Sequence, residues 1–155
     1  MPELIEEYIE TNQLDKGSLK LDLHSDLSVL QDDLLYAFLT TKRKLANLLC
    51  IPIQVSGETN VPTTLQQIRY LSVIFDDLIY MLHESPQTVD RIIQFHVETM
   101  SNEFIAFTIS SPLHIDEKLH TSLKLFDAIL QFKQLGAVVE IELQPVKVSI
   151  QSPVI

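Results

Sequence analysis

Residues 73–86 most constrain how this chain folds, because a long apolar stripe runs into them and stops at a proline. Its apolar positions recur at helical spacing from residue 68 onward, so a helix here presents one wide apolar face to a core. Thr63 or Thr64 can cap its start, and Thr64 with Gln67 has the spacing of a capping box. Pro86 disfavours helical geometry in the residue before it, so we predict a helix from about residue 65 to residue 85. The stripe consists of Ile68, Leu71, Ile74, Phe75, Leu78, Ile79 and Leu82.

The first two predicted elements are a short helix and a strand. Residues 2–13 carry one apolar stripe and predict the helix, which Gly17 can end by taking the left-handed conformation. Residues 19–23 alternate leucine with polar side chains, as a half-buried strand does.

A second helix and a second strand come before the long apolar helix. Residues 27–49 predict the helix, which Ser25 or Asp26 can cap. Residues 51–55 alternate and are rich in branched side chains, so they predict a strand, and residues 57–62 predict a loop. The apolar positions expected to face the core in the second helix are Leu27, Leu30, Leu34, Phe38, Leu45 and Leu48.

The remainder of the chain predicts a hairpin, a helix and two more strands. Residues 91–98 and 103–110 flank a short polar turn, which is typical of adjacent antiparallel strands. Residues 117–134 predict a helix, and strands are predicted over residues 137–143 and 146–150.

The order of these elements predicts an α/β fold. Strands and amphipathic helices that succeed one another in this way favour a two-layer sandwich, with a mixed, mostly antiparallel sheet and helices on one face. We expect one domain over residues 18–155, preceded by the helix within residues 1–17.

Charge and composition exclude several classes of partner. The net charge of -10, from 21 acidic and 11 basic side chains among 155 residues, repels nucleic acid and anionic lipid. No apolar run is long enough to span a bilayer, so no membrane contact is expected in this chain. Cys50 is the only cysteine, which excludes an internal disulfide and fits a cytoplasmic location. We expect its thiol to be buried rather than nucleophilic.

Read in order, the chain resembles the catalytic and ATP-binding domain of bacterial sensor histidine kinases, a family related to gyrase and to the heat-shock chaperone of about ninety kilodaltons. Residues 4–23 resemble the end of the family's second dimerisation helix and the first strand of its ATP-binding domain. They read L-I-E-E-Y-I-E-T-N-Q-L-D-K-G-S-L-K-L-D-L. Residues 65–86 resemble the helix with the family's asparagine motif, Ser85 and Pro86 matching its usual ending. The resemblance implies the fold of that domain and a role in two-component signalling.

The resemblance also implies an ATP site, but this chain departs from the nucleotide motifs. Of the two asparagines spaced four apart on the family's helix, the second binds magnesium, and Asp76 and Tyr80 stand at these positions. Asp76 can still bind a hard cation through oxygen. Tyr80 is a poor magnesium ligand, and we expect it to pack at the rim of a filled cleft.

The glycine motifs of the family are altered as well. After the hairpin the family has an aspartate for the adenine amino group, followed by glycines, where this chain has Ser110, Ser111 and Pro112. The second glycine motif aligns with residues 121–125, which contain no glycine. Lys124 there is either a remaining phosphate contact or an ordinary surface lysine. Between the two motifs the lid of the family is reduced to residues 113–122.

Other residues with chemical potential have simpler interpretations. His83 and Glu84 form the residue pair of a phospho-accepting histidine, but the family has that pair on its first dimerisation helix, so we expect no phosphorylation at His83. His24, near two aspartates, is interpreted as the end of a strand. No metal site and no catalytic set of nucleophile, base and orienting group is predicted.

The leading hypothesis is a degenerate histidine-kinase-like domain without catalytic residues, nucleotide or other cofactor, which acts as a protein interaction or regulatory module in two-component-type signalling. One alternative is a sensor histidine kinase fragment that binds ATP with Mg in an atypical pocket. Another is a histidine phosphotransferase with a kinase-like domain. The expected partner is a signalling protein, and a homodimer can form through Leu4, Tyr8 and Ile9.

Overall fold

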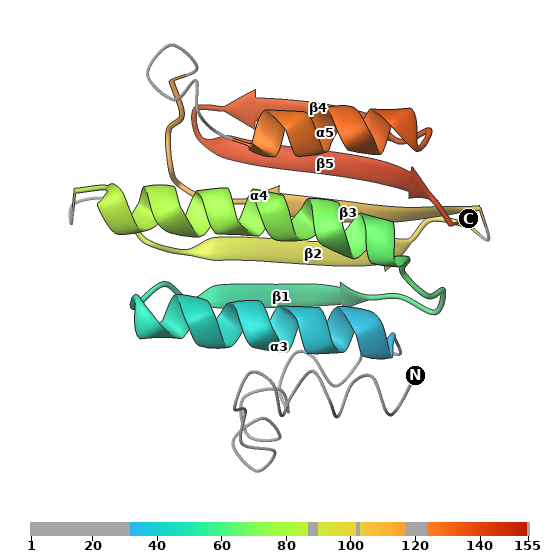
Figure 1. The fold of residues 1–155 in the computed structure, drawn as a ribbon, viewed down its shortest axis with the longest axis horizontal. Coiled ribbons are helices and arrows are strands. Elements are labelled where there is room, and N and C mark those ends of the chain that lie inside the picture. Colours follow the sequence, from blue (N-terminus) through green and yellow to red (C-terminus); the bar gives the residue numbers. More distant parts are fainter. Residues whose placement is uncertain (1–31, 87–89, 102, 117–123, 155) are drawn as a thin grey trace.

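The computed structural model describes residues 32–86, 90–101, 103–116 and 124–154. Over these residues the chain forms two layers, a five-stranded sheet and three helices (Figure 1). The helix predicted within residues 2–13, the strand at residues 19–23 and the boundary after residue 17 lie outside the described residues.

The sheet is mixed and mostly antiparallel, as predicted. Its spatial order is β1-β2-β3-β5-β4, with β1 parallel to β2 and the other neighbours antiparallel. The predicted hairpin is present as β2 and β3, and the predicted last two strands are β4 and β5. The strands are β1 (Ile53–Glu58), β2 (Ile93–Thr99), β3 (Phe104–Ser110), β4 (Val138–Leu143) and β5 (Val146–Pro153).

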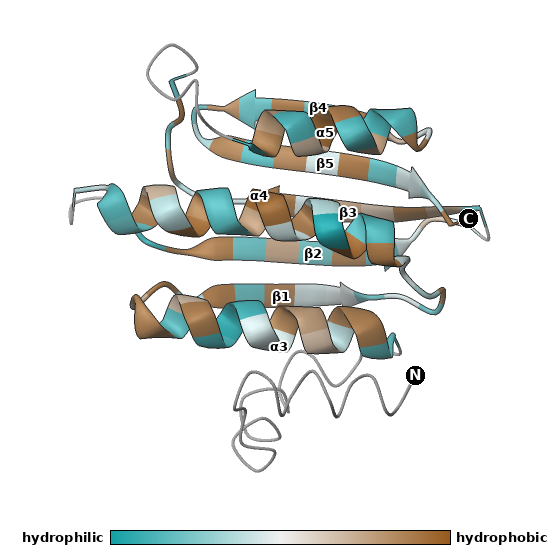
Figure 2. Ribbon diagram, viewed as in Figure 1, coloured by the Kyte–Doolittle hydropathy of each residue, from teal (hydrophilic) through white to brown (hydrophobic). Residues whose placement is uncertain are grey.

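All three helices cover the same face of the sheet, which confirms the predicted sandwich. In Figure 1, α3 (Asp33–Leu48) lies along β1, α4 (Leu65–Glu84) lies over the middle of the sheet, and α5 (Leu125–Gln134) lies over β4 and β5. Apolar and polar residues alternate along the strands (Figure 2), so one row of side chains enters the core and the other faces away from the helices.

Aromatic side chains join the two layers at the centre of the core. The rings of Phe75 on α4 and Phe95 on β2 lie 5.6 Å apart, and those of Phe95 and Phe107 lie 6.1 Å apart. Phe107 is in turn 6.5 Å from Phe132 of α5. All four are fully buried, so this chain of rings fixes α4 and α5 on the sheet.

The start and end of α4 agree with the prediction. The Thr64 amide donates to Gln67 Oε1 at 2.9 Å, and the Gln67 amide donates to Thr64 Oγ1 at 3.2 Å, which completes the capping box. Gln67 is itself buried and donates from Nε2 to Ser152 Oγ at 2.8 Å. This bond fixes the first turn of α4 to β5. The helix ends at Glu84, and Ser85 is its C-cap.

The prediction for α3 was wrong at its start and in part of its buried face, since Phe38 is buried as predicted but Leu45 and Leu48 are not. Leu27 and Leu30 lie outside the described residues. Neither Ser25 nor Asp26 caps the helix, which begins at Asp33 with Asp32 as its N-cap. The Asp32 carboxylate accepts from the Leu34 amide at 3.1 Å and also from the amide and hydroxyl of Thr63. Leu45 and Leu48 are exposed, because the side chains that face the core lie on a neighbouring stripe of the helix. That stripe contains Leu35, Phe38, Leu39 and Ala46.

Two smaller predictions, on Gly57 and on Cys50, also need correction. Gly57 and Glu58 belong to β1 rather than to a loop, because Gly57, at φ +88°, continues the strand opposite Val97. The helix predicted over residues 117–134 is described as α5 from Leu125 to Gln134, and residues 117–123 lie outside the described residues. Cys50 is exposed rather than buried, because it lies in the turn after α3 in a left-handed conformation, with φ +60°.

Candidate functional site

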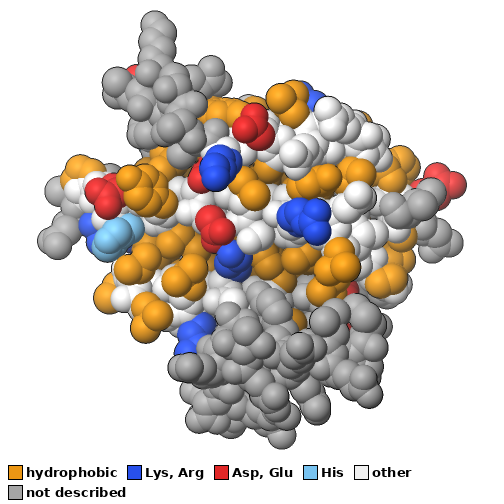
Figure 3. All heavy atoms as spheres, viewed as in Figure 1, with side chains coloured by type: hydrophobic (Ala, Val, Ile, Leu, Met, Phe, Trp, Pro, Cys, Tyr) orange, Lys and Arg blue, Asp and Glu red, His pale blue; other side chains and the backbone are white. Residues whose placement is uncertain are grey.

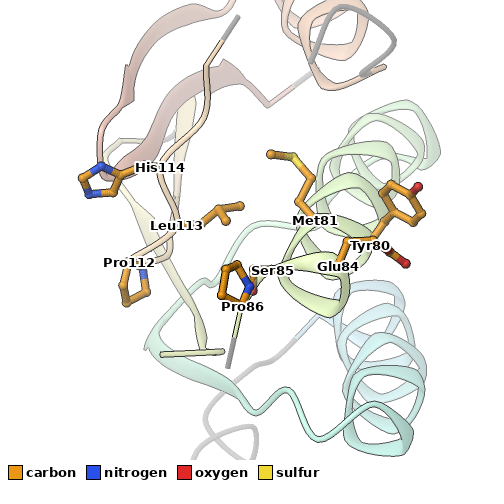
Figure 4. Close-up of a pocket in the computed structure, with 8 residues that line it drawn as sticks. All are labelled: Tyr80, Met81, Glu84, Ser85, Pro86, Pro112, Leu113 and His114. Carbon is orange, nitrogen blue, oxygen red and sulfur yellow. The ribbon is translucent and has the colours of Figure 1, made fainter. Parts of the chain in front are cut away.

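A pocket of about 760 Å³ lies between the C-terminal end of α4 and the segment that follows β3 (Figure 4). Met81 and Leu113 form its buried floor, and their side chains point toward one another. The described residues that line it are Tyr80, Met81, Glu84, Ser85, Pro86, Pro112, Leu113 and His114. By the resemblance, these two segments are those that hold the nucleotide in histidine kinases.

Asp76 is already paired with a cation from the neighbouring helix. Its Oδ1 atom lies 2.6 Å from Nζ of Lys42 on α3, and the Lys42 side chain is only 12% exposed. A largely buried lysine held this close offsets the charge of the half-exposed carboxylate that matches the first family asparagine. Asp76 therefore contributes to the contact between α3 and α4.

Tyr80 lies one turn further along α4, on the rim of the pocket. The residue is 63% exposed, and Glu84 follows it at the helical spacing of four residues. A phenol and a carboxylate therefore occupy the side of α4 that carries the magnesium ligand in the family.

Ser110 points away from the pocket. The helix-facing residues of β3 are Ile105, Phe107 and Ile109, so the next side chain lies on the opposite face of the sheet. There its Oγ donates to Gln94 Oε1 at 3.4 Å.

The segment from Ser111 to Ile115 is fixed to the turn between β4 and β5. The Ser111 amide donates to the carbonyl of Val146 at 3.1 Å, and the Val146 amide donates to Leu113 at 2.8 Å. The Ile115 amide adds a third bond, to Leu143, at 2.8 Å. Leu113 and Ile115 are both buried, so core side chains occupy the stretch that replaces the glycine loop.

The N-terminus of α5 is capped by a carboxylate from another helix. Asp77 Oδ2 of α4 accepts a hydrogen bond of 2.7 Å from the Leu125 amide, and the Lys124 amide also donates to this carboxylate. Burial raises the pKa of Asp77, although these two hydrogen bonds oppose the rise. Lys124, a candidate phosphate contact, has an exposed side chain that makes no capping bond to α5.

Sequence reasoning missed Asp77, because its partner lies 48 residues further along the chain. The adjacent Asp76 was chosen for its match to the family motif, whereas the geometry makes Asp77 the residue that touches the α5 terminus. The one signal in the sequence that could have indicated Asp77 is that it is an acidic residue directly after the motif position Asp76.

The remaining candidates do not join this site. His83 is exposed near the end of α4, whereas His24, Leu4, Tyr8 and Ile9 lie outside the described residues. Within the described ranges, no three His, Cys, Asp or Glu side chains are grouped as metal ligands. No helix in this part of the chain has the length and apolar character needed to cross a membrane. On the face shown in Figure 3, Lys and Arg side chains are scattered among apolar ones.

The structure is similar to histidine kinase domains. The histidine kinase domain from the blue-light activated histidine kinase of Erythrobacter litoralis EL346 matches with a TM-score of 0.55 and 15% identity, over 76% of this chain and 63% of that chain. A second structure of that kinase gives a TM-score of 0.48 and 18% identity, over 76% of this chain and 44% of that chain. No family model matches the sequence, and neither does any curated protein. The chain thus has the fold of a histidine kinase domain and spans less than two thirds of the first neighbour's length.

Proposed function

We propose that this chain is a non-catalytic module with a histidine kinase fold, which binds a protein partner in two-component-type signalling and does not bind nucleotide. The observation that carries this proposal is the Asp77 carboxylate on the backbone amides at the start of α5. In the family that the chain resembles, amides at this helix terminus hold phosphate. Here the chain supplies its own anion.

An internal carboxylate disfavours phosphate at this position in two ways. It already satisfies the amide donors that attract an anion to a helix N-terminus. Its negative charge also repels an incoming phosphate across a distance at which screening is weak. A nucleotide would have to displace Asp77 and leave a half-buried carboxylate without its hydrogen bonds, which costs about 1–3 kcal/mol.

Two further contacts support the same proposal. Asp76 is paired with Lys42, so magnesium binding there would have to compete with the ammonium group. Leu113, 6% exposed, fills the stretch in which the family has its glycine loop. ATP with magnesium therefore does not fit the residues at these positions.

Isothermal titration calorimetry with ATP and MgCl₂ tests the loss of nucleotide binding. We expect no binding heat from the full chain, whereas an active histidine kinase domain titrated in the same buffer gives a normal isotherm. A dissociation constant below about 1 mM would overturn the proposal and favour an ATP-binding kinase fragment.

The interaction role is tested separately through the N-terminal stripe. If Leu4, Tyr8 and Ile9 join two copies, changing Tyr8 and Ile9 to glutamate halves the mass measured by light scattering, because buried charge disfavours the interface. An unchanged mass would remove the homodimer from the proposal. Cytoplasmic location also remains a prediction.

A further inference from the structure

Strand β4 is the outermost strand on its side of the sheet, within the residues that the structure describes (Figure 1). Its neighbour β5 directs the backbone groups of its even-numbered residues to β3 and the residues that flank β3. The Val146 amide donates to the carbonyl of Leu113, and the Val154 amide donates to that of Glu103, each at 2.8 Å. Because the direction of these groups alternates along a strand, the odd-numbered residues of β5 bond to β4.

The register of β4 on β5 then shows which groups of β4 face outward. The even-numbered residues of β4 lie opposite the odd-numbered ones of β5, so their backbone groups are used within the sheet. The amides and carbonyls of Val139 and Ile141 point away from β5, and in the described part of the chain no backbone group bonds to them. The third outward residue, Leu143, accepts at its carbonyl from the Ile115 amide at 2.8 Å. Two residues of β4 therefore offer donors and acceptors to a further strand.

The side chains at this edge are apolar on one face and acidic on the other. Those that face the helices are apolar and only partly buried, so an added strand would cover them further. The open face is exposed and carries Glu140 and Glu142. On β5, Lys147 lies opposite Glu142, but the residue opposite Glu140 is Ser149. The open face of this edge therefore has a net negative charge.

We propose that β4 pairs with an extended segment of a protein partner in which apolar and basic residues alternate. The segment runs antiparallel to β4 and bonds to the backbone of Val139 and Ile141. Its apolar side chains lie on the side of the helices, and its Lys or Arg side chains lie beside Glu140 and Glu142, because residues opposite one another share a face. This inference rests on the proposed function, since it identifies the surface through which the module binds its partner.

The chain's own strand pairing supports an occupant of this kind. Residues 146–148 of β5 read V-K-V and run antiparallel along the inner side of β4, where Lys147 meets Glu142. A basic alternating segment would make the same contacts on the outer side. The net charge of -10 also attracts such a segment before contact.

A second copy of this chain is disfavoured at the same edge. Two antiparallel β4 strands centred on Ile141 would place Glu140 of one copy opposite Glu142 of the other, and like charges in that position repel. The two glutamates thus select a basic strand and oppose self-association.

Amide NMR on the full ¹⁵N-labelled chain tests this proposal, with acetyl-Lys-Val-Lys-Val-Lys-amide as the probe at up to about 10 mM, since few hydrogen bonds form. We expect the peptide to shift the amide signals of Val139 and Ile141 and to slow their exchange with D₂O. The amide of Val97, in β2, is the internal control and should not move. N-methylation of both valines of the peptide should weaken binding at least about tenfold, because the valine amides face β4 in an antiparallel pair.

A second peptide and two double variants test the charge. Acetyl-Glu-Val-Glu-Val-Glu-amide should bind about tenfold more weakly than the lysine peptide. Glu140→Gln with Glu142→Gln should abolish this difference. Glu58→Gln with Glu98→Gln removes the same charge from exposed, mutually opposite positions of β1 and β2, and should preserve it.

The opposite results are equally specific. Equal binding of the N-methylated peptide would overturn strand pairing, and equal binding of the two charged peptides would overturn the basic occupant. Shifts of Val139 and Ile141 on dilution of the chain alone would show a second copy at the edge and would overturn the proposal as well. If the lysine peptide moves neither signal and ATP with magnesium gives no binding heat, only this inference fails. Binding of ATP with magnesium would instead overturn the proposed function.

Discussion

The carboxylate of Asp77 accepts a 2.7 Å hydrogen bond from the backbone amide of Leu125, which joins the middle of α4 to the first residue of α5. The bond replaces a local cap, since Lys124 at the N-cap position makes no side-chain bond to the helix. It therefore does two things at once. It fixes the angle at which α5 enters the helix layer, and it places a negative charge where the family that the chain resembles binds phosphate.

Replacing Asp77 separates the hydrogen bond from the charge. Asp77→Ala should lower the free energy of unfolding by about 1–2 kcal/mol, because the Leu125 amide loses its acceptor. Asp77→Asn keeps an oxygen acceptor and should change it by less than about 0.5 kcal/mol. Urea unfolding followed by circular dichroism measures both, with the exposed Glu103→Ala as a neutral control. If the asparagine variant were as unstable as the alanine variant, the charge of Asp77 and not its hydrogen bond would be what stabilises the fold.

The pKa of Asp77 predicts how stability depends on pH. Burial raises this pKa above 3.8 and the charge of Asp76 adds to the rise, whereas the amides of Leu125 and Lys124 and the charge of Lys124 oppose it. The folded state thus holds the proton more tightly than the unfolded state. The contribution of Asp77 is fully present below its unfolded pKa and is lost as pH rises through its folded pKa. The native chain should lose stability relative to Asp77→Asn from about pH 4 upward, as urea unfolding at several pH values would measure. A constant or rising difference would contradict this sign.

The parts of the fold that sequence could predict are those set by neighbouring residues. The capping box joins Thr64 and Gln67, three residues apart, and Pro86 marks the end of the same helix within two residues. The hairpin of β2 and β3 likewise follows from two alternating runs and a short polar turn. Such local signals gave the correct order of the described elements and the mostly antiparallel sheet.

The parts that sequence could not predict depend on distant partners. Asp32 caps α3 because Thr63, 31 residues away, holds its carboxylate in place. In α3 the leucines lie on adjacent stripes, and contact with the other elements buries Leu35 and Leu39 rather than Leu45. Prediction of the candidate site from sequence is limited in the same way. The resemblance located Asp76, but only the tertiary structure brings Lys42 to it.

Of the two glycines in the described residues, Gly57 should be the less tolerant of change. A Cβ added there would lie 1.9 Å from the Val97 carbonyl oxygen, and the residue has φ +88°. Gly136 has a similar φ of +93°, but its nearest atom, Pro153 Cγ, would lie at 3.4 Å. Gly136→Ala should cost about 1–2 kcal/mol from strain, and Gly57→Ala should cost at least about 2 kcal/mol more from the clash. Thermal unfolding of the two variants compares them, and equal costs would show that β1 shifts to make room.

Cys50 should be a stabilising position for glycine. It is exposed and adopts φ +60° in the turn after α3, where its amide donates to the carbonyl of Asn47 at 3.1 Å. Glycine relieves the left-handed strain and keeps that bond, so Cys50→Gly should raise the free energy of unfolding by about 0.5–1 kcal/mol. Cys50→Ala retains the strain and should bring no gain. Urea unfolding under reducing conditions measures both, and an equal gain from alanine would assign the effect to the thiol.

Leu113 tests whether the stretch that replaces the glycine loop is a true part of the core. Its side chain is buried and forms part of the pocket floor, while its carbonyl accepts from the Val146 amide at 2.8 Å. Leu113→Ala leaves this backbone bond intact, so its cost reports the lost packing and should be about 2–4 kcal/mol by urea unfolding. Pro112→Ala, at an exposed neighbouring position, should cost less than about 1 kcal/mol. If Leu113→Ala costs no more than Pro112→Ala, the stretch is loosely packed. Leu113 would then not exclude a nucleotide, and Asp77 and Asp76 would remain the residues that disfavour its binding.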